Sequence, residues 1–204
     1  MDYSTTEGRE YFYRSGEEFV DKTFENVKVR LPARQRALEI GCGIGRLTFP
    51  YSAQFEEVYA VDISETMLRK LREEADKRQI RNIKTFQAKE KWDTPGYFDY
   101  AYSFLVFQHI EDFKEIENYI AMTADSLKLG GFALFHFDTR SSNILYRIRN
   151  ITPDFFLPWN YRKGIRRIRR NANRLRAVFE KNGLKVTEEY RPNSEHHTYL
   201  LVKA

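Results

Sequence analysis

Residues 37–48 read ALEIGCGIGRLT, and this stretch decides the fold. Its first four residues are apolar enough for a short buried strand, and the alternating glycines Gly41, Gly43 and Gly45 then predict a tight turn. A helix is expected from Arg46 onward. A strand, a glycine turn and a helix in that order are typical of an open α/β sheet.

The chemistry of this turn follows from its backbone. Glycine reaches backbone angles closed to other residues and has no Cβ to keep a ligand away. The free N–H groups of such a turn lie at the carboxyl end of a strand, where open α/β sheets bind ligands. The alternative is a tight strand-to-helix turn that holds no ligand.

The spacing of the glycines indicates which ligand to expect. A dinucleotide turn reads G-x-G-x-x-G, whereas this one reads G-x-G-x-G with Glu39 two residues before Gly41. The stretch from Glu39 to Gly45 resembles the E-x-G-x-G-x-G motif of class I S-adenosylmethionine-dependent methyltransferases. The resemblance implies a Rossmann-like α/β fold with a seven-stranded, mostly parallel sheet, a C-terminal antiparallel hairpin and helices on both faces. It also implies S-adenosyl-L-methionine as cofactor and S-adenosyl-L-homocysteine as product.

An acid ends the next predicted strand. The run VYAVD places Asp62 17 residues after Gly45. A carboxylate at this strand end accepts hydrogen bonds from both ribose hydroxyls in dinucleotide folds, and the same acid is a hallmark of the methyltransferase family. Alternatively, Asp62 caps the helix that begins near Ser64, and the two roles are compatible.

The resemblance carries over to further positions along the chain. An acid commonly follows the third strand, predicted here over 82–88, and binds the adenine amino group. This sequence departs from that pattern with Lys89, and Glu90 takes the role if the loop shifts by one residue. The expected cofactor-binding residues are Glu39, Gly41, Cys42, Gly43, Gly45, Asp62, Ile63, Met67, Lys89, Glu90, Ser103 and Phe104.

A fourth strand with its loop is predicted over 98–106, reading FDYAYSFLV and followed by FQHIED. The pattern F-D-x-x-x-S…H resembles the fourth-strand region of small-molecule methyltransferases. It implies that the segment from Ser103 to His109 faces the transferred methyl group, with His109 as a candidate general base. The alternative is that His109 packs against or caps the loop.

The acceptor site is expected near the N-terminus and after the fifth strand. One or two amphipathic helices are predicted over 2–31, and in the resembling family such helices help to form the substrate pocket. The alternative is that their aromatic residues pack on the sheet. Asp138 lies near the end of the fifth strand, which is predicted over 132–137, and is a further candidate to line the pocket. The candidate substrate residues are Tyr11, Tyr13, Gln108, His136, Trp159 and Arg162.

The remaining elements complete a single methyltransferase domain over 1–204. Helices are predicted over 46–55, 64–77, 112–129 and 171–182, and the final strands over 185–190 and 197–203. The sequence LKLGG, which resembles the family's L-K-P-G-G, is expected to close the helix over 112–129. The expected divisions are an N-terminal helical cap (1–34), a cofactor-binding core (35–138), a basic and aromatic substrate insertion (139–171), and a last helix with the hairpin (172–204).

Composition describes a soluble globular protein. The chain has 204 residues, of which 42% are hydrophobic and 31% charged. No apolar run reaches the ~20 residues of a membrane span, and the N-terminus does not resemble a secretory signal. The single cysteine, Cys42, cannot form an internal disulfide, so we expect a cytoplasmic protein. No metal-ligand spacing is evident.

The net charge of +5 is concentrated in one segment. Residues 147–176 hold ten basic residues and one acid, Asp154, which leaves 24 basic and 28 acidic residues elsewhere. A local basic patch points to a partner rather than to the fold.

The leading hypothesis is methylation of a hydroxyl of a small or medium-sized metabolite, with this segment recognising an anionic group. The alternatives are an RNA methyltransferase that uses the segment for backbone contact and base stacking, a solvated basic surface, or an inactive cofactor-binding partner subunit, which Lys89 favours. The glycine spacing disfavours a nicotinamide oxidoreductase.

Overall fold

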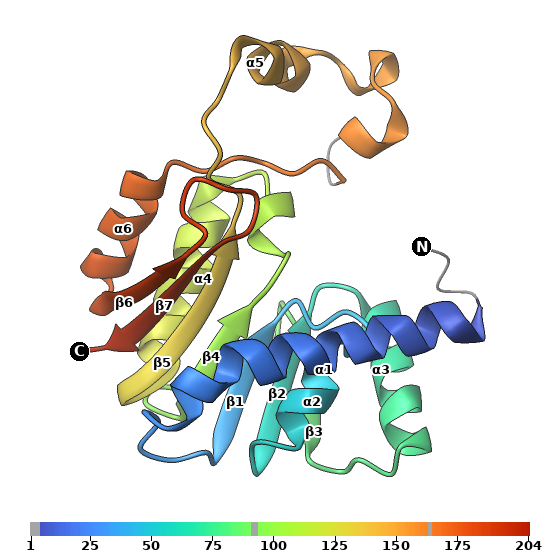
Figure 1. The fold of residues 1–204 in the computed structure, drawn as a ribbon, viewed down its shortest axis with the longest axis vertical. Coiled ribbons are helices and arrows are strands. Elements are labelled where there is room, and N and C mark those ends of the chain that lie inside the picture. Colours follow the sequence, from blue (N-terminus) through green and yellow to red (C-terminus); the bar gives the residue numbers. More distant parts are fainter. Residues whose placement is uncertain (1–4, 91–93, 163–164) are drawn as a thin grey trace. The chain divides into compact units, whose positions relative to one another are not determined.

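The structure, a computed structural model, describes residues 5–90, 94–162 and 165–204 (Figure 1). Its strands are β1 (Arg36–Ile40), β2 (Glu57–Asp62), β3 (Ile83–Gln87), β4 (Phe98–Ser103), β5 (Leu127–Phe137), β6 (Leu184–Tyr190) and β7 (His197–Lys203). Its α-helices are α1 (Thr6–Lys28), α2 (Thr48–Ser52), α3 (Glu65–Lys77), α4 (Phe113–Ser126), α5 (Ile144–Ile151) and α6 (Ala172–Lys181). Three 3₁₀ turns complete it: η1 (Phe107–His109), η2 (Asp154–Phe156) and η3 (Trp159–Tyr161).

The seven strands form one sheet in the order β3-β2-β1-β4-β5-β7-β6. β1 pairs in parallel with both β2 and β4, and β2 pairs in parallel with β3. β6 and β7 form an antiparallel hairpin with a register shift between Val186 and Glu188. The expected Rossmann-like fold is therefore confirmed. Because chain order reverses at β1, its carboxyl end is a topological switch point, where open α/β sheets bind ligands.

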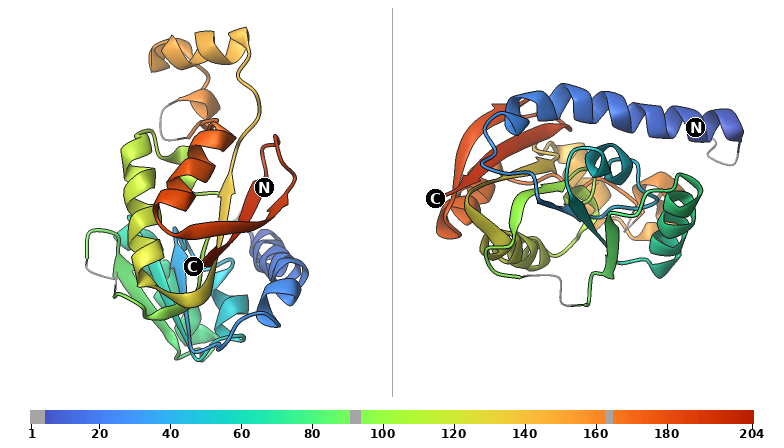
Figure 2. Two further views of the ribbon diagram at one scale, coloured as in Figure 1. Left: turned by 90° about the vertical axis from the view of Figure 1, so that its left-hand side faces the viewer. Right: turned by 90° about the horizontal axis from the view of Figure 1, so that it is seen from below.

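The chain divides into two compact units. The first comprises Met1–Tyr102 and Ser126–Phe132, and the second comprises Ser103–Asp125 and Ala133–Ala204. In the first unit α1 lies along α2 (Figures 1 and 2) and buries Phe24 against the rings of Tyr51, Phe55 and Tyr100. The core there is aromatic because long side chains from α1, α2 and β4 meet on one face of the sheet.

The second unit has its own aromatic core. The ring of Phe107 stacks on Phe137 with centroids 5.3 Å apart, and Phe179 from α6 packs edge-on to Tyr199 from β7. Helices α4 and α6 lie side by side (Figure 2). The ring of Phe107 also lies 6.2 Å from that of Tyr119 in α4, so burial of these rings packs both helices against the sheet.

The helix predicted over 112–129 ends earlier than expected. α4 ends at Ser126, and β5 begins at Leu127 and already includes the LKLGG sequence. The cause is a side-chain anchor: Lys128 Nζ lies 2.7 Å from Asp99 Oδ1 and 3.0 Å from Gln35 Oε1. A Cβ at Gly131 would lie 3.0 Å from the Asp99 carbonyl oxygen, so this close approach requires glycine.

Other boundaries differ in detail. The N-terminal region forms one helix, the helix expected over 46–55 shortens to α2, and the segment 139–171 contains α5. The side chain of Asn143 caps α5 by accepting from the Tyr146 amide at 2.8 Å. The last helix and the hairpin form as predicted. No helix among the described residues is long and apolar enough to cross a membrane.

Candidate functional site

The glycine turn at the end of β1 is held in an open conformation. Gly41, Gly43 and Gly45 all have positive φ, at 78°, 54° and 95°, which favours glycine at each position. A Cβ at Gly45 would lie 2.7 Å from the ring of Phe49, whereas nothing lies within 4 Å of a Cβ at Gly43. The space beside Gly43 leaves its backbone accessible to a ligand.

Asp62 ties this turn to the end of β2. Its Oδ2 accepts a hydrogen bond from the Gly43 amide at 2.8 Å, and its Oδ1 accepts from the Ser64 amide at 2.8 Å. Ser64 in turn caps α3. A carboxylate offers about four acceptor positions, so each oxygen of Asp62 keeps capacity for a ligand hydroxyl. The predicted helix-capping role and the predicted ligand role are thus geometrically compatible.

Glu39 lies behind the turn, where it is almost fully buried. Its Oε2 accepts from Thr48 Oγ1 at 2.5 Å and from the Tyr102 hydroxyl at 3.0 Å. Burial raises the pKa of the Glu39 carboxyl to about 7, although these hydrogen bonds and the charge of Arg46 oppose the shift. The acid therefore links β1, α2 and β4 within the first unit. Sequence reasoning missed Thr48 and Tyr102 because the pairing of Glu39 with Tyr102 depends on strand register.

Cys42 is buried inside the same turn and packs with Phe49 and Leu68. Burial raises the pKa of its thiol. A thiol in this state is a weak nucleophile, so Cys42 serves as a small packing residue.

Two apolar residues beside Asp62 face solvent. Ile63 is 82% exposed and Met67 is 37% exposed. Lys89 is also exposed. The Glu90 carboxylate turns back to accept from the Gln87 amide at 2.9 Å. An apolar surface next to an acid at a strand end suits a ligand with a flat ring and hydroxyl groups.

Tyr13 lies against the glycine turn, whereas Tyr11 does not. The Tyr13 hydroxyl donates to the Ile44 carbonyl at 3.4 Å and its ring lies 5.5 Å from that of Phe49. Tyr11 is half-exposed on the same helix, with Arg14 over its ring. These contacts of Tyr13 are packing contacts on the glycine turn, whereas its predicted role in the substrate pocket stays a prediction.

Gln108 and His109 form the polar end of η1 in the second unit. Gln108 is 2% exposed, and its Nε2 lies 3.0 Å from His109 Nε2. Gln108 Oε1 is buried and has no hydrogen-bond partner among the described residues. Burial lowers the pKa of His109 below its usual value, and the charge of Arg167 adds to this, although hydrogen bonds with the backbone of Arg166 and Ile165 oppose the shift. The imidazole is therefore neutral at pH 7.

His136 is fully buried beside this region. Its Nδ1 lies 3.4 Å from the Leu105 amide, its Nε2 lies 3.2 Å from His196 Nδ1, and its ring packs on Phe104. Burial and the neighbouring His196 lower the pKa of His136 to about 3. Ser103, predicted as a cofactor residue together with Phe104, is buried at the start of the second unit.

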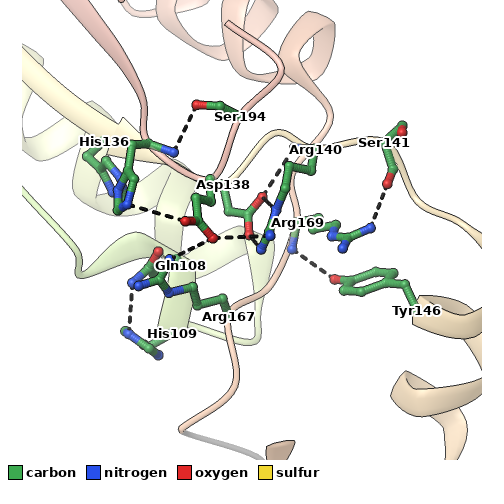
Figure 3. A network of polar contacts seen from close by, with 12 residues as sticks. Gln108, His109, His136, Asp138, Arg140, Ser141, Tyr146, Arg167, Arg169 and Ser194 are labelled. Atoms are coloured by element: carbon green, nitrogen blue, oxygen red, sulfur yellow. Dashed lines mark hydrogen bonds and ion pairs between the residues drawn. The ribbon is translucent and has the colours of Figure 1, made fainter. Parts of the chain in front are cut away.

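Asp138 anchors an ion-pair network that sequence reasoning did not assemble (Figure 3). Its fully buried carboxylate receives the guanidinium of Arg140 through two hydrogen bonds of 3.1 and 2.6 Å. Glu195 lies 3.1 Å from both Arg140 and Arg167. The network joins the end of β5 to the loop between β6 and β7. No local sequence pattern predicts an ion pair between residues so far apart in the chain.

Trp159 begins η3 and Arg162 follows it in the basic segment. Trp159 is 69% exposed, and Arg162 Nε donates to the Leu157 carbonyl at 3.1 Å. Among the described residues, no hydrogen bond joins either side chain to Gln108 or His109. Lys163, one of the ten basic residues, lies outside the described residues. No group of acids, histidines or cysteine in the described ranges is arranged to hold a metal ion.

Comparison with known proteins agrees with this geometry. Residues 38–133 match the model of a family described as a methyltransferase domain. An S-adenosylmethionine-dependent methyltransferase from Clostridium acetobutylicum superimposes with a TM-score of 0.68 and 16% identity, covering 93% of this chain and 91% of that one. Curated proteins include none that matches this sequence.

Two further solved structures have the same fold. The magnesium protoporphyrin IX methyltransferase of Synechocystis, with bound S-adenosylhomocysteine, gives a TM-score of 0.67 at 17% identity and covers 95% of this chain and 86% of that one. A methyltransferase of Haloferax volcanii in complex with a methyltransferase activator gives 0.64 at 15% identity, covering 94% and 97%.

Proposed function

We propose that this chain, a class I S-adenosylmethionine-dependent methyltransferase, methylates a hydroxyl group of a small or medium-sized anionic metabolite. The observation that carries the hydroxyl is the half-buried, neutral His109, whose Nε2 accepts from the Gln108 amide nitrogen at 3.0 Å. A hydroxyl is a weak nucleophile until a base removes its proton, and a neutral imidazole within hydrogen-bond reach supplies that base. We further propose that residues 1–204 act as a single methyltransferase domain.

S-adenosyl-L-methionine is the cofactor and S-adenosyl-L-homocysteine the product. The residues of the first unit suit this cofactor, because the backbone at Gly43 is open and Asp62 keeps acceptor capacity for two ribose hydroxyls. Ile63 and Met67 offer an exposed apolar surface to the adenine ring. The predicted contacts of Lys89 and Glu90 with the adenine edge remain part of the proposal.

The cofactor supplies an activated methyl group, so the chain's main tasks are positioning and exclusion of water. Gln108 orients His109 through their 3.0 Å contact, in which the amide nitrogen donates to His109 Nε2, so the neutral ring carries its proton on Nδ1. His109 Nε2 is therefore the nitrogen that would take up the proton of the acceptor hydroxyl. When bound, the cofactor would supply the methyl group, whose bond to sulfur would break as its bond to the acceptor oxygen forms. The buried His136 keeps its ring neutral and offers a second polar edge beside Phe104.

The anionic character of the acceptor is supported by the arginines that follow β5. Among the described residues, Arg169 and Arg170 have no ion-pair partner, and each donates to backbone carbonyls instead. A metabolite with a negatively charged group compensates such charges. Trp159 and Arg162 are proposed to contact the same molecule.

A second candidate acceptor is RNA, because the basic segment also exposes several aromatic rings. Phe155, Phe156 and Trp159 are 86%, 72% and 69% exposed. Exposed rings stack on unpaired bases, while arginines contact the phosphates. Neutralisation of about five phosphates on a single strand gives a slope near −3.5 for log affinity against log salt concentration. Salt-insensitive or absent RNA binding removes this candidate.

The experiment that tests the proposal uses methyl-labelled S-adenosylmethionine, the purified protein and a cell extract. The extract is first separated into RNA, neutral small molecules and anionic small molecules. The proposal predicts label in the anionic small-molecule pool, with magnetic resonance placing the methyl group on oxygen. Label confined to RNA, to neutral molecules or to nitrogen contradicts it.

A further inference from the structure

A polar cavity of about 540 Å³ lies in the second unit, between the end of β5 and the start of α6. Four arginines line it, together with serine and asparagine side chains, and no acidic residue does. Its volume falls in the range of roughly 300–1,000 Å³ that is typical of sites for small ligands. The lining therefore consists of hydrogen-bond donors and positive charge around a space large enough for a metabolite.

Two of the four arginines are already neutralised. Arg140 is paired with the buried Asp138 and also lies 3.1 Å from Glu195. Arg176 forms two hydrogen bonds, of 2.8 and 2.7 Å, with the carboxylate of Glu189. These bidentate pairs fix both guanidinium groups in place, but they leave little net charge for a ligand.

The other two arginines are not neutralised. Arg169 Nη1 donates to the Ser141 carbonyl at 2.6 Å, and its guanidinium lies over the ring of Tyr146 (Figure 3). Arg170 Nη2 donates to the carbonyls of Ile110 and Glu111. No carboxylate lies within ion-pair distance of either side chain in the described part of the chain. Carbonyls and rings orient a guanidinium without cancelling its charge.

Burial makes these charges costly when the cavity is empty. The Nε atoms of Arg169 and Arg170 are buried and have no hydrogen-bond partner among the described residues. Burial lowers the pKa of Arg170, and the charge of Arg174 adds to this, whereas Tyr146 and Asp112 oppose the shift. A buried donor without a partner is costly. An anion in the cavity would offset part of this cost through its charge, without bonding to the buried Nε atoms themselves.

We propose that this cavity binds the phosphate group of a small phosphomonoester. Two uncompensated guanidinium groups match the charge of about −1.5 to −2 on a phosphomonoester at pH 7. Three phosphate oxygens also use more donors than a carboxylate does, and Ser142 and Asn173 line the same space. The first turn of α6 begins at the cavity, and its N-terminal dipole favours an anion.

That the bound phosphomonoester is also the methyl acceptor rests on the proposed function. The inference deepens that function, because it names phosphate as the anionic group of the acceptor. Binding itself does not depend on methyl transfer. A binding assay without S-adenosylmethionine therefore tests this inference separately. Phosphate binding can fail while methyl label still appears in anionic small molecules, and the reverse is also possible.

Isothermal titration calorimetry with glycerol 3-phosphate tests the site, with inorganic phosphate and malonate as comparison probes. The wild-type protein is predicted to bind glycerol 3-phosphate at one site and malonate at least tenfold more weakly. Arg169→Gln and Arg170→Gln are each predicted to weaken glycerol 3-phosphate binding by about 10- to 100-fold, the range for hydrogen bonds to a charged group. The exposed Arg147→Gln, which makes the same charge change away from the cavity, should alter affinity less than about twofold.

A further variant separates loss of binding from loss of folding. Asn173 is exposed in the first turn of α6, where an acid stabilises a helix. Asn173→Asp should therefore keep or raise thermal stability and still weaken glycerol 3-phosphate binding severalfold by repulsion. Absent binding of glycerol 3-phosphate, equal binding of malonate, or equal losses in Arg147→Gln and Arg170→Gln would each overturn the proposal. If inorganic phosphate binds as tightly as glycerol 3-phosphate, the proposal of a phosphomonoester ligand is overturned and the cavity is assigned to free phosphate instead.

Discussion

The buried Glu39 makes a prediction about stability that depends on pH. Its carboxyl lies behind the glycine turn with a pKa near 7, whereas an unfolded glutamate titrates near 4.5. Glu39→Gln keeps an acceptor oxygen for Thr48 and Tyr102 but removes the titration. The substitution therefore isolates the cost of ionising a buried acid.

The magnitude follows from the two pKa values. Below pH 4.5 Glu39 is protonated in both the folded and the unfolded protein and has no pH-dependent effect. As the pH rises from 4.5 to 7, the unfolded chain loses the proton first, so the folded state loses stability relative to it. The two pKa values differ by about 2.5, and at 1.36 kcal/mol for each tenfold change in acidity this gives a loss of roughly 3 kcal/mol above pH 7.

Urea unfolding between pH 4.5 and pH 8 measures this loss. The free energy of unfolding of Glu39→Gln minus that of the wild type should rise by about 3 kcal/mol across the range. A control is Glu57→Gln on the adjacent strand, whose pKa is lowered by Lys84, so its small effect should have the opposite sign. A Glu39→Gln difference that does not change with pH would refute the assigned burial.

The remaining predictions concern residues near the turn and the proposed base. Gly16→Ala should destabilise the protein by about 1–3 kcal/mol in urea unfolding, because the new Cβ would lie 1.9 Å from the Arg46 carbonyl oxygen; unchanged stability would contradict the close packing of α1. Cys42 should resist a thiol reagent in the native state and react once the protein is unfolded, since it is 5% exposed; rapid native reaction would contradict its burial. His109→Gln should reduce kcat by about 10²- to 10⁴-fold, the typical contribution of a general base, and the pH at which the wild-type rate falls to half should lie below the usual histidine pKa of 6.5 because the pKa of His109 is lowered; a half-maximal rate above pH 6.5 would contradict this.

The fold was largely predictable because its deciding signals are local. The glycine turn, the acid that ends β2 and the end of α6 before Gly183 each depend on neighbouring residues, and the strand order agreed with the resemblance. The start of β5 was not predictable, since Leu127 and Lys128 continue a helical pattern. Only the distant partner Asp99 draws Lys128 into the sheet.

The candidate site was predictable only in part. The positions of Gly43 and Asp62 followed from the motif, and their hydrogen bond was found in the structure. The roles of Arg169 and Arg170 did not follow, because ten basic residues in one segment do not reveal which of them an acid neutralises. Neutralisation depends on the three-dimensional structure: the carboxylate of Asp138 pairs with Arg140, which lies outside that segment, and no carboxylate pairs with Arg170 among the described residues.

The central claim is that S-adenosylmethionine binds at the glycine turn with its ribose on Asp62. The most direct measurement is calorimetric titration of S-adenosylhomocysteine into the wild type, Asp62→Ala and Asp99→Asn. Asp99 is the matched control because it also accepts two backbone amides, from Gln35 and Arg36, each at 2.9 Å. The account predicts saturable binding that Asp62→Ala weakens by about 1.5–3 kcal/mol and that Asp99→Asn leaves unchanged. No binding by the wild type, or an unchanged dissociation constant in Asp62→Ala, would contradict it.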